Sequence, residues 1–332
     1  MFQRPSHRLL ISVACVVSLG LLAFVFYRFV TSSRSAVPDA GHQRIEHFDA
    51  AETRFRLGKA AADAGNHDRA LADYTEAIHL DPKRWPYYFF RGDSYGALKQ
   101  CDNAIADYTE VIRLNPDFVG AYVRRSGAHG MKKEYNLAIV DCNRAIEIAD
   151  RQGPGRAVER TLALNRRAET YAAARDFTRA IADYSELIRL NPQDADRYSN
   201  RGACYGFKGD FESGIADFSE AIRLNPKSSL FYKSRALAYF RKAEYDLAIA
   251  DCTRAVQIDA GDAAPYHLRA AAHQVKQEFD KAIADYTDSI RLNPKAKDSF
   301  VGRAAAYRSL GKNKEAGNDE RAVRQLENEV GR

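Results

Sequence analysis

One phrase returns along the chain with little change. Residues 104–116 read AIADYTEVIRLNP, residues 180–192 read AIADYSELIRLNP, and residues 282–294 read AIADYTDSIRLNP. Near-copies of a segment as long as a helix indicate a chain built from repeats. The period of repetition therefore limits the possible folds more than any other feature of the sequence.

The period is about 34 residues. Pro82 and Pro116 close successive phrases, and Pro192 and Pro226 are separated by the same interval. The small residue that opens each phrase recurs eight times: Ala70, Ala104, Ala138, Ala180, Gly214, Ala248, Ala282 and Ala316. We therefore expect eight repeats with an eight-residue insertion at 151–158. Their approximate bounds are 48–82, 83–116, 117–150, 159–192, 193–226, 227–260, 261–294 and 295–328.

Each repeat divides into two stretches with helical periodicity. In the first stretch an aromatic residue is followed by a small residue four positions later and often by Tyr three further on, as in Tyr198, Gly202 and Tyr205. In the second stretch the small residue comes first, as in Ala70 and Tyr74. Spacings of three and four place these side chains on one helix face. The short polar turns between the stretches suit antiparallel neighbouring helices, and Asn-Pro ends the second helix.

This pattern closely resembles the tetratricopeptide repeat over about residues 48–328. The resemblance implies an all-α fold, a right-handed α-solenoid of stacked antiparallel helix pairs, whose first helices line a concave peptide-binding groove. The chain departs from the family pattern only at single positions. These are Arg54 and Leu164 for the first aromatic residue, His129 and His273 for Tyr, and Asp150, Ala260 and Asn328 for the closing proline.

The chain begins with an apolar run. Residues 9–27, LLISVACVVSLGLLAFVFY, carry no charge and are long enough to cross a hydrocarbon core of about 30 Å. We predict a tail at 1–8, a transmembrane anchor at 9–30, a linker at 31–47 and the repeat domain at 48–332. An uncleaved anchor is favoured over a signal peptide because the run is longer than a usual cleavable core.

The orientation of the anchor is less constrained. Two Arg stand on each side of the apolar run, so the positive-inside rule does not decide. A short tail before a long domain favours repeats outside the cytoplasm, which would be the periplasm if the organism is a Gram-negative bacterium. The unpaired cysteines of the repeats favour the opposite side.

Two charged positions recur with the repeat. The first helix carries Arg just before its small residue in seven repeats, and Leu57 breaks the series. The second helix carries Asp in all eight. A binding residue is expected to vary along a groove, whereas a structural one repeats, so we predict a ladder of Arg–Asp pairs within or between repeats. Its members are Arg91, Arg125, Arg167, Arg201, Arg235, Arg269 and Arg303, with Asp73, Asp107, Asp141, Asp183, Asp217, Asp251, Asp285 and Asp319.

The resemblance also implies where groove residues lie: three and two positions before the small residue of each first helix. Of these sixteen residues four are basic and none is acidic. The pattern fits an extended peptide with acidic groups or a free carboxylate, with Phe89 and Phe90 as apolar anchors. A solvated helix face is the alternative. The candidates are Phe55, Arg56, Phe89, Phe90, Arg124, Asn165, Arg166, Asn200, Lys233 and His267.

Other kinds of function find no support in the sequence. The net charge is +6, and the basic residues are spread evenly along the chain rather than clustered as in a nucleic-acid-binding surface. Motifs of metalloproteases, phosphate loops and hydrolases are absent, the cysteines form no CxxC pair, and the His are scattered, so we expect no metal, no cofactor and no enzyme activity. We predict a membrane-tethered protein-interaction scaffold. The alternatives are a chaperone-like subunit of a secretion or envelope assembly machine and, less favoured, a repeat domain associated with an enzyme.

Overall fold

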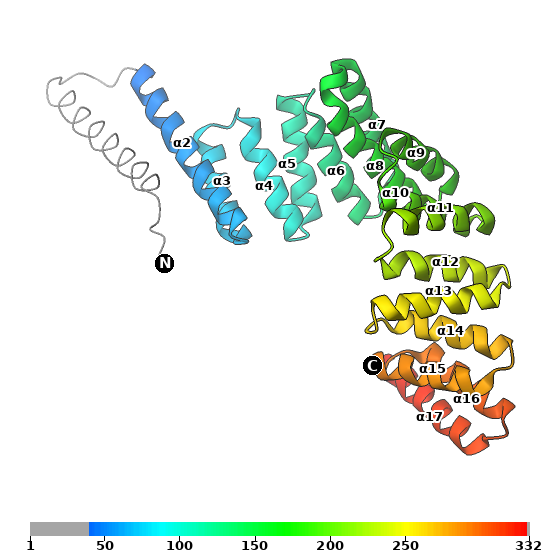
Figure 1. Cartoon of the computed structure of the whole chain (residues 1–332). Helices are drawn as coiled ribbons and strands as arrows, with labels where there is room; N and C mark the ends of the chain where they lie inside the picture. Colours follow the sequence, from blue (N-terminus) through cyan, green and yellow to red (C-terminus); the bar gives the residue numbers. More distant parts are fainter. Residues whose placement is uncertain (1–39, 331–332) are drawn as a thin grey trace, which may run out of the picture. The chain divides into compact units, whose positions relative to one another are not determined.

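The computed structural model describes residues 40–330, with side chains described for 49–328. Within this range the chain forms sixteen α-helices and one short 3-10 helix, and no strand. The chain divides into two compact units, Met1–Tyr87 and Tyr88–Arg332, and each is described by itself. Figure 1 labels the helices in chain order.

The first unit contains α2 (Ala40–Asp63), α3 (His67–Leu80) and the first residues of α4 (Trp85–Ala97). Its core is aromatic. Tyr74 and Tyr87 are almost fully buried, and the ring centroid of Phe55 lies 5.9 Å from that of Tyr74 and 5.0 Å from that of Tyr87. Helix α2 begins inside the segment predicted as a linker. Residues 42–47, HQRIEH, include Gln, Arg and Glu and no Gly or Pro, so they can continue a helix.

The second unit continues α4 and adds thirteen α-helices, and helices that follow one another in sequence pack side by side from α5 to α17. Their bounds are α5 (Cys101–Leu114), α6 (Val119–Met131), α7 (Tyr135–Gln152), α8 (Ala157–Ala173), α9 (Phe177–Leu190), α10 (Ala195–Phe207), α11 (Phe211–Leu224), α12 (Ser229–Arg241), α13 (Tyr245–Ile258), α14 (Ala263–Val275), α15 (Phe279–Leu292), α16 (Lys297–Ser309) and α17 (Asn313–Val330).

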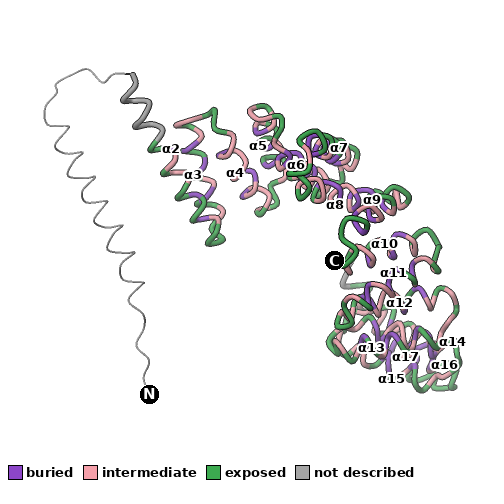
Figure 2. The backbone as a smooth tube through the Cα atoms, turned by 45° about the horizontal axis from the view of Figure 1, so that its top comes forward, coloured by how far each residue is buried: buried purple, intermediate pink, exposed green. Residues whose placement is uncertain are grey.

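First and second helices alternate in this unit. The first helices also contact one another directly, α6 with α8, α10 with α12, α12 with α14, and α14 with α16. Buried residues recur in each helix pair rather than gathering at one centre (Figure 2). This is the core of an all-α helical-repeat solenoid, in which each repeat is stabilised mainly by its neighbours.

The insertion near residue 150 lengthens two helices. Helix α7 has 18 residues where α5 and α9 have 14, and α8 has 17 residues where α6 and α10 have 13. A short 3-10 helix, η1 (Pro154–Arg156), joins them. The extra residues thus add about one turn to each helix.

At Gly58, Gly92 and Gly202 an aromatic ring of the second helix packs against the small residue of the first helix. At Gly92 an added Cβ would lie 2.8 Å from Cε1 of Tyr108, which is closer than real Cβ atoms come to a neighbour. The packing of Tyr108 therefore requires glycine at this position. The sequence spacing of small and aromatic residues is in this way translated into the contact between the two helices of a repeat.

The turn between the two helices has one residue in the left-handed region. After α4 this residue is Lys99, with a φ of 59°, and the next amide, Gln100 N, donates to Tyr95 O at 2.8 Å. This pairing satisfies carbonyls at the end of the first helix. The equivalent residues are Gly65, Lys99, Lys133, Arg175, Gly209, Ala243, Gln277 and Gly311.

The predicted membrane anchor at 9–30 lies outside the described residues. From residue 40 to residue 330, every helix is too short or too polar to cross a membrane.

Candidate functional site

A hollow lies between the first helices α4 and α6, with α5 as its floor. Its volume is about 390 Å³, and Asp93, Tyr108, Arg124 and Met131 are among its lining residues. Nε of Arg124 lies 3.3 Å from Oδ1 of Asp93, and the hydroxyl of Tyr108 donates to the same oxygen at 2.8 Å. Burial raises the pKa of Asp93, against the opposing effects of Arg124 and Tyr108. We call this site the polar hollow.

A second hollow occupies the equivalent place between α10 and α12, with α11 as its floor. Its volume is about 600 Å³. Its key positions follow their counterparts in the polar hollow at one constant sequence offset, so Ala203 replaces Asp93 and Ser234 replaces Arg124. We call this site the apolar hollow. Its lining residues include Ala203, Phe207, Phe218, Ser234, Leu237 and Arg241.

A third hollow of about 250 Å³ lies between α6 and α8 and shares Gly127, Met131 and Arg166 with the polar hollow. Nη1 of Arg166 lies 3.0 Å from Oε2 of Glu169 inside it. The three hollows lie along the first helices of the second unit. They form a discontinuous groove on that face.

The basic groove candidates already hold acids of the chain. Arg124 pairs with Asp93 and Arg166 pairs with Glu169, both within the hollows. Nζ of Lys233 lies 2.5 Å from Oδ2 of Asp262, and in the first unit Nε of Arg56 lies 3.2 Å from Oε1 of Glu52. The expected excess of positive charge at these positions is therefore largely neutralised. The sequence pattern missed the acids because they stand outside the two positions considered.

The aromatic and imidazole candidates are packed. Phe55 belongs to the core of the first unit, and the ring of Phe89 lies 5.1 Å from that of Phe118. Phe90 meets Phe89 edge to face at 5.6 Å. His267 Nδ1 lies 2.9 Å from Ser299 Oγ, and burial lowers the pKa of His267. Of these candidates, Phe55, Phe89 and His267 thus contact side chains of neighbouring helices.

The two amide candidates differ. Asn165 is half-buried, donates to Glu169 at 2.8 Å and accepts from Arg197. Asn200 is exposed. Neither lines one of the three hollows. One of the two predicted positions does line them, two residues before the small residue, as Arg124, Arg166 and Ser234 do. Positions one, four and five residues after the small residue also line them, as in Ala203, Gly206 and Phe207. A signal for them was present in the sequence, since glycine recurs four residues after the small residue at Gly96, Gly130 and Gly206.

The ladder residues lie elsewhere, between first and second helices. Nε and Nη2 of Arg201 donate to the two carboxylate oxygens of Asp217, each at 2.8 Å. The same bidentate pair joins each of the seven predicted Arg to the Asp sixteen residues later. The hydrogen bonds to Asp217 raise the pKa of Arg201 above its ordinary value. The Arg guanidinium and the carboxylate therefore fix the two helices of one repeat.

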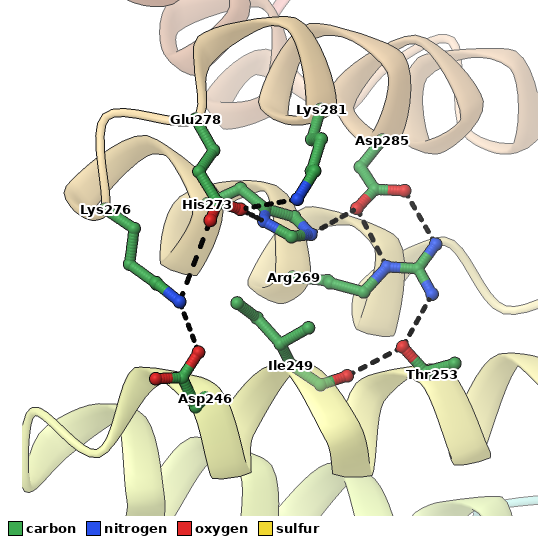
Figure 3. A network of polar contacts seen from close by, with 9 residues as sticks. All are labelled: Asp246, Ile249, Thr253, Arg269, His273, Lys276, Glu278, Lys281 and Asp285. Atoms are coloured by element: carbon green, nitrogen blue, oxygen red, sulfur yellow. Dashed lines mark hydrogen bonds and ion pairs between the residues drawn. The ribbon is translucent and has the colours of Figure 1, made fainter.

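From Arg125 onward each ladder Arg also reaches the preceding repeat, which the sequence analysis did not foresee. Nη1 of Arg269 donates to the hydroxyl of Thr253 at 3.0 Å, and that hydroxyl donates to Ile249 O at 2.7 Å (Figure 3). A Ser, Thr or Asn takes this role two residues after the Asp of the preceding repeat. One guanidinium thus bridges three helices.

The first repeat replaces the missing Arg in another way. Leu57 stands at the ladder position, and Arg54, one turn earlier on α2, donates to Asp73 Oδ1 at 3.3 Å. Arg54 is the residue that departs from the family pattern at the first aromatic position. Arg54 therefore supplies the guanidinium for Asp73 that Leu57 cannot supply.

Polar contacts at the turns join neighbouring repeats as well. Nζ of Lys132 lies 2.7 Å from Asp102 Oδ1 and 2.8 Å from Glu134 Oε1. In Figure 3, Lys276 contacts both Asp246 and Glu278, and His273 Nδ1 lies 2.6 Å from Glu278 Oε2. The hydrogen bond to His273 lowers the pKa of Glu278. His273, which replaces Tyr, therefore ties the end of its helix to the turn.

The four cysteines of the described residues are free. Burial raises the pKa of Cys142 and Cys204 to about 11 and that of Cys252 to about 12. Across residues 40–330 no group of three or more His, Cys, Asp or Glu is placed to hold a metal ion. The three buried thiols, Cys142, Cys204 and Cys252, thus serve as packing groups.

Comparison with protein families recognises part of the chain. Tetratricopeptide-repeat models match residues 51–84, 86–118, 162–194 and 205–263. These segments therefore carry tetratricopeptide repeats, and proteins with such repeats are in general non-catalytic protein-interaction scaffolds. No curated protein matches the chain significantly in sequence.

Solved structures of similar fold are numerous. A tetratricopeptide repeat protein from Parabacteroides merdae is 16% identical, with a TM-score of 0.59, covering 78% of this chain and 99% of its own. The C-terminal part of a repeat-containing protein from Cytophaga hutchinsonii is 18% identical, with a TM-score of 0.60, covering 75% and 98%. At these identities the likeness shows the helical-repeat fold alone.

Proposed function

We propose that this protein is a non-catalytic interaction scaffold that binds an extended peptide segment along the first-helix face of its second unit. The observation that carries the proposal is the row of three hollows between first helices, at equivalent positions of the repeats. Their open, concave form offers places for successive side chains of a bound segment. The general role of tetratricopeptide repeats as protein-interaction scaffolds supports it.

The ion pairs described above change the expected chemistry of the partner. A carboxylate that approached Arg124 or Arg166 must compete with Asp93 or Glu169. An acidic peptide would therefore be attracted mainly by Arg or Lys side chains that form no ion pair among the described residues. Arg241, at the edge of the apolar hollow, is exposed and is such a cation.

The test is site-specific photo-crosslinking in cells that express the full chain. A photoreactive phenylalanine analogue is placed at Met131 or Phe207, which line hollows, or at Val140, which is 63% exposed on α7 and lines none of them. The proposal predicts a crosslinked partner of the same size from both hollow positions and none from Val140. Equal crosslinking from Val140, or none from the hollows, contradicts it.

We also propose that residues 9–30 tether the repeats to a membrane, with the repeats outside the cytoplasm. The uncharged apolar run supports the tether. Because burial raises the pKa of three of the four repeat cysteines, those thiols resist oxidation, and their lack of partners does not argue against an oxidising compartment.

A phosphatase that is active only outside the cytoplasm, fused after Arg332, tests the orientation. Activity in whole cells is the expected result. An inactive but stable fusion contradicts the orientation, and recovery of the full chain in the soluble fraction contradicts the tether.

A further inference from the structure

We propose that the apolar hollow receives a large apolar side chain of the partner peptide, and that Arg241 binds a carboxylate next to that side chain. The proposal rests on the function proposed above and names the partner's chemistry at one site. The segment it describes carries an aromatic or Leu-sized residue adjacent to Asp, Glu or a C-terminal carboxylate.

Two substitutions relative to the polar hollow remove its internal ion pair from the apolar hollow. Where Asp93 and Arg124 form an ion pair, the apolar hollow has Ala203 and Ser234. Its volume of about 600 Å³ falls in the range of about 300–1,000 Å³ usual for sites that bind ligands. The hollow is therefore roomy enough for a large side chain and lacks the internal charges of its counterpart.

The walls of the apolar hollow are apolar and partly fixed in place. Phe207 is 72% exposed, although its ring stacks on Phe177 with 5.1 Å between centroids and 8° between planes. Leu237 on α12 is 47% exposed, and Phe218 forms the buried floor. An exposed aromatic ring held by a stacked neighbour presents apolar area at little further cost in conformational entropy.

The charge at this hollow is positive. Lys208 and Arg241 are its two charged lining residues, and no acid lines it. Nζ of Lys208 lies 3.1 Å from Thr178 Oγ1, while the nearby Asp210 accepts the amide of Ser213 as the N-cap of α11. Arg241 makes no ion pair among the described residues. A carboxylate beside the apolar side chain would supply its missing partner through charge-assisted hydrogen bonds.

The experiment selects peptides from a phage-displayed library of random nonapeptides on the full-length protein in detergent. Synthetic versions of the enriched peptides are then titrated by fluorescence anisotropy. We expect an enriched apolar residue next to an acid. Replacing that apolar residue by Ala should weaken binding by about 10- to 100-fold, as the burial of a large side chain implies.

Variants of the protein locate the site. Ala203→Asp with Ser234→Arg installs the ion pair of the polar hollow and should weaken binding at least about tenfold. Phe207→Ala should also weaken it and, because the side chain is exposed, leaves the fold intact. Arg241→Gln should weaken the acidic peptide and leave its Asn or Gln analogue unchanged. The matched control, Asn136→Arg with Val140→Asp, adds the same charges to exposed positions of α7 and should leave the dissociation constant unchanged.

The possible results distinguish failure of this inference from failure of the proposed scaffold function. If peptides bind with equal affinity to the wild type, the filled hollow and Phe207→Ala, the inference is wrong and the scaffold function stands. If selection yields no peptide and crosslinking yields no partner, both are wrong.

Discussion

The polar and apolar hollows occupy the same place in two different repeats, but their interiors differ in kind. In the polar hollow Asp93 holds both Arg124 and the hydroxyl of Tyr108. In the apolar hollow Ala203 and Phe218 take the places of Asp93 and Tyr108, and neither can make such a bond. The same backbone position of the repeat thus accommodates either a hydrogen-bonded ion pair or apolar side chains.

The ladder beside the two hollows is the same. Arg91 with Asp107 and Arg201 with Asp217 form equivalent bidentate pairs. The two hollows therefore differ in the side chains that line them, on first and second helices alike, and not in the ladder pair beside them. The first of four predictions concerns the ladder, which the two regions share, and the other three concern residues that differ between them.

The largest effect should be equal in the two regions. Asp107→Ala and Asp217→Ala each remove the buried carboxylate of a ladder pair, whose side chain is 6% exposed in Asp107 and 8% exposed in Asp217. We expect each to lower the free energy of unfolding by about 3 kcal/mol, because a largely desolvated guanidinium, 18% exposed in Arg91 and 19% exposed in Arg201, is left without its anion. Urea titration of each variant measures this.

Asp102→Ala is the control for the ladder variants. The side chain of Asp102 is 84% exposed and pairs with Lys132, so its loss should cost less than about 1 kcal/mol. Ladder variants no more damaging than this control would show that the ladder does not hold the repeats together.

The next effect should be specific to the polar hollow. Asp93→Ala leaves the buried hydroxyl of Tyr108 without its acceptor, which should cost about 1–3 kcal/mol. Adding Tyr108→Phe should restore most of the loss, since the double variant has the Ala and Phe that the apolar hollow carries naturally. A double-mutant cycle by urea titration measures the coupling, and additive losses would contradict the prediction.

The turns beside the two hollows should respond in opposite directions. Lys99 has a φ of 59°, whereas its counterpart is Gly209 with a φ of 83°. Lys99→Gly should stabilise by less than about 1 kcal/mol, and Gly209→Ala should destabilise by about 1 kcal/mol, because the left-handed conformation is costly for residues with a Cβ. Melting temperatures of the two variants check the sign, and a shift in the same direction would refute the argument.

The smallest effect concerns pH. Because burial raises the pKa of Asp93 above its ordinary 3.8, its contribution to stability is full below that value and is lost as pH rises through the raised folded pKa. Asp93→Asn should therefore reduce the fall in stability over this interval. Melting temperatures measured at closely spaced pH values check this, and parallel curves for the variant and the wild type would contradict it.

Much of the fold could be predicted from the sequence. The repeat period places the helices because small and aromatic residues at helical spacing must meet, as Gly92 and Tyr108 do. The positions of the ladder Arg and Asp could also be found, since a contact made inside every repeat must recur with the period of the repeat. Its third member was missed, although a Ser, Thr or Asn follows two residues after each Asp from Asp107 to Asp285.

The candidate site was less predictable. Position along one helix cannot reveal which side chains from neighbouring helices meet, so the pairing of Lys233 with Asp262 was not foreseen. The hollows arise from small residues such as Ala203 and Gly206, which leave space only in relation to the helices around them. The position of Phe89 along its helix likewise does not reveal that its ring packs edge to face against that of Phe118.

Each ladder Arg from Arg125 onward connects two neighbouring repeats, and this connection couples their folding. Since Arg269 holds Thr253 of the preceding repeat as well as Asp285 of its own, one repeat cannot open without loosening the next. Such nearest-neighbour dependence is the source of cooperativity in linear arrays, where interior units are protected and terminal units open first. A ligand that spans several repeats would add to this coupling. Binding at one hollow would then reduce fluctuations of the neighbouring repeats without changing their average structure.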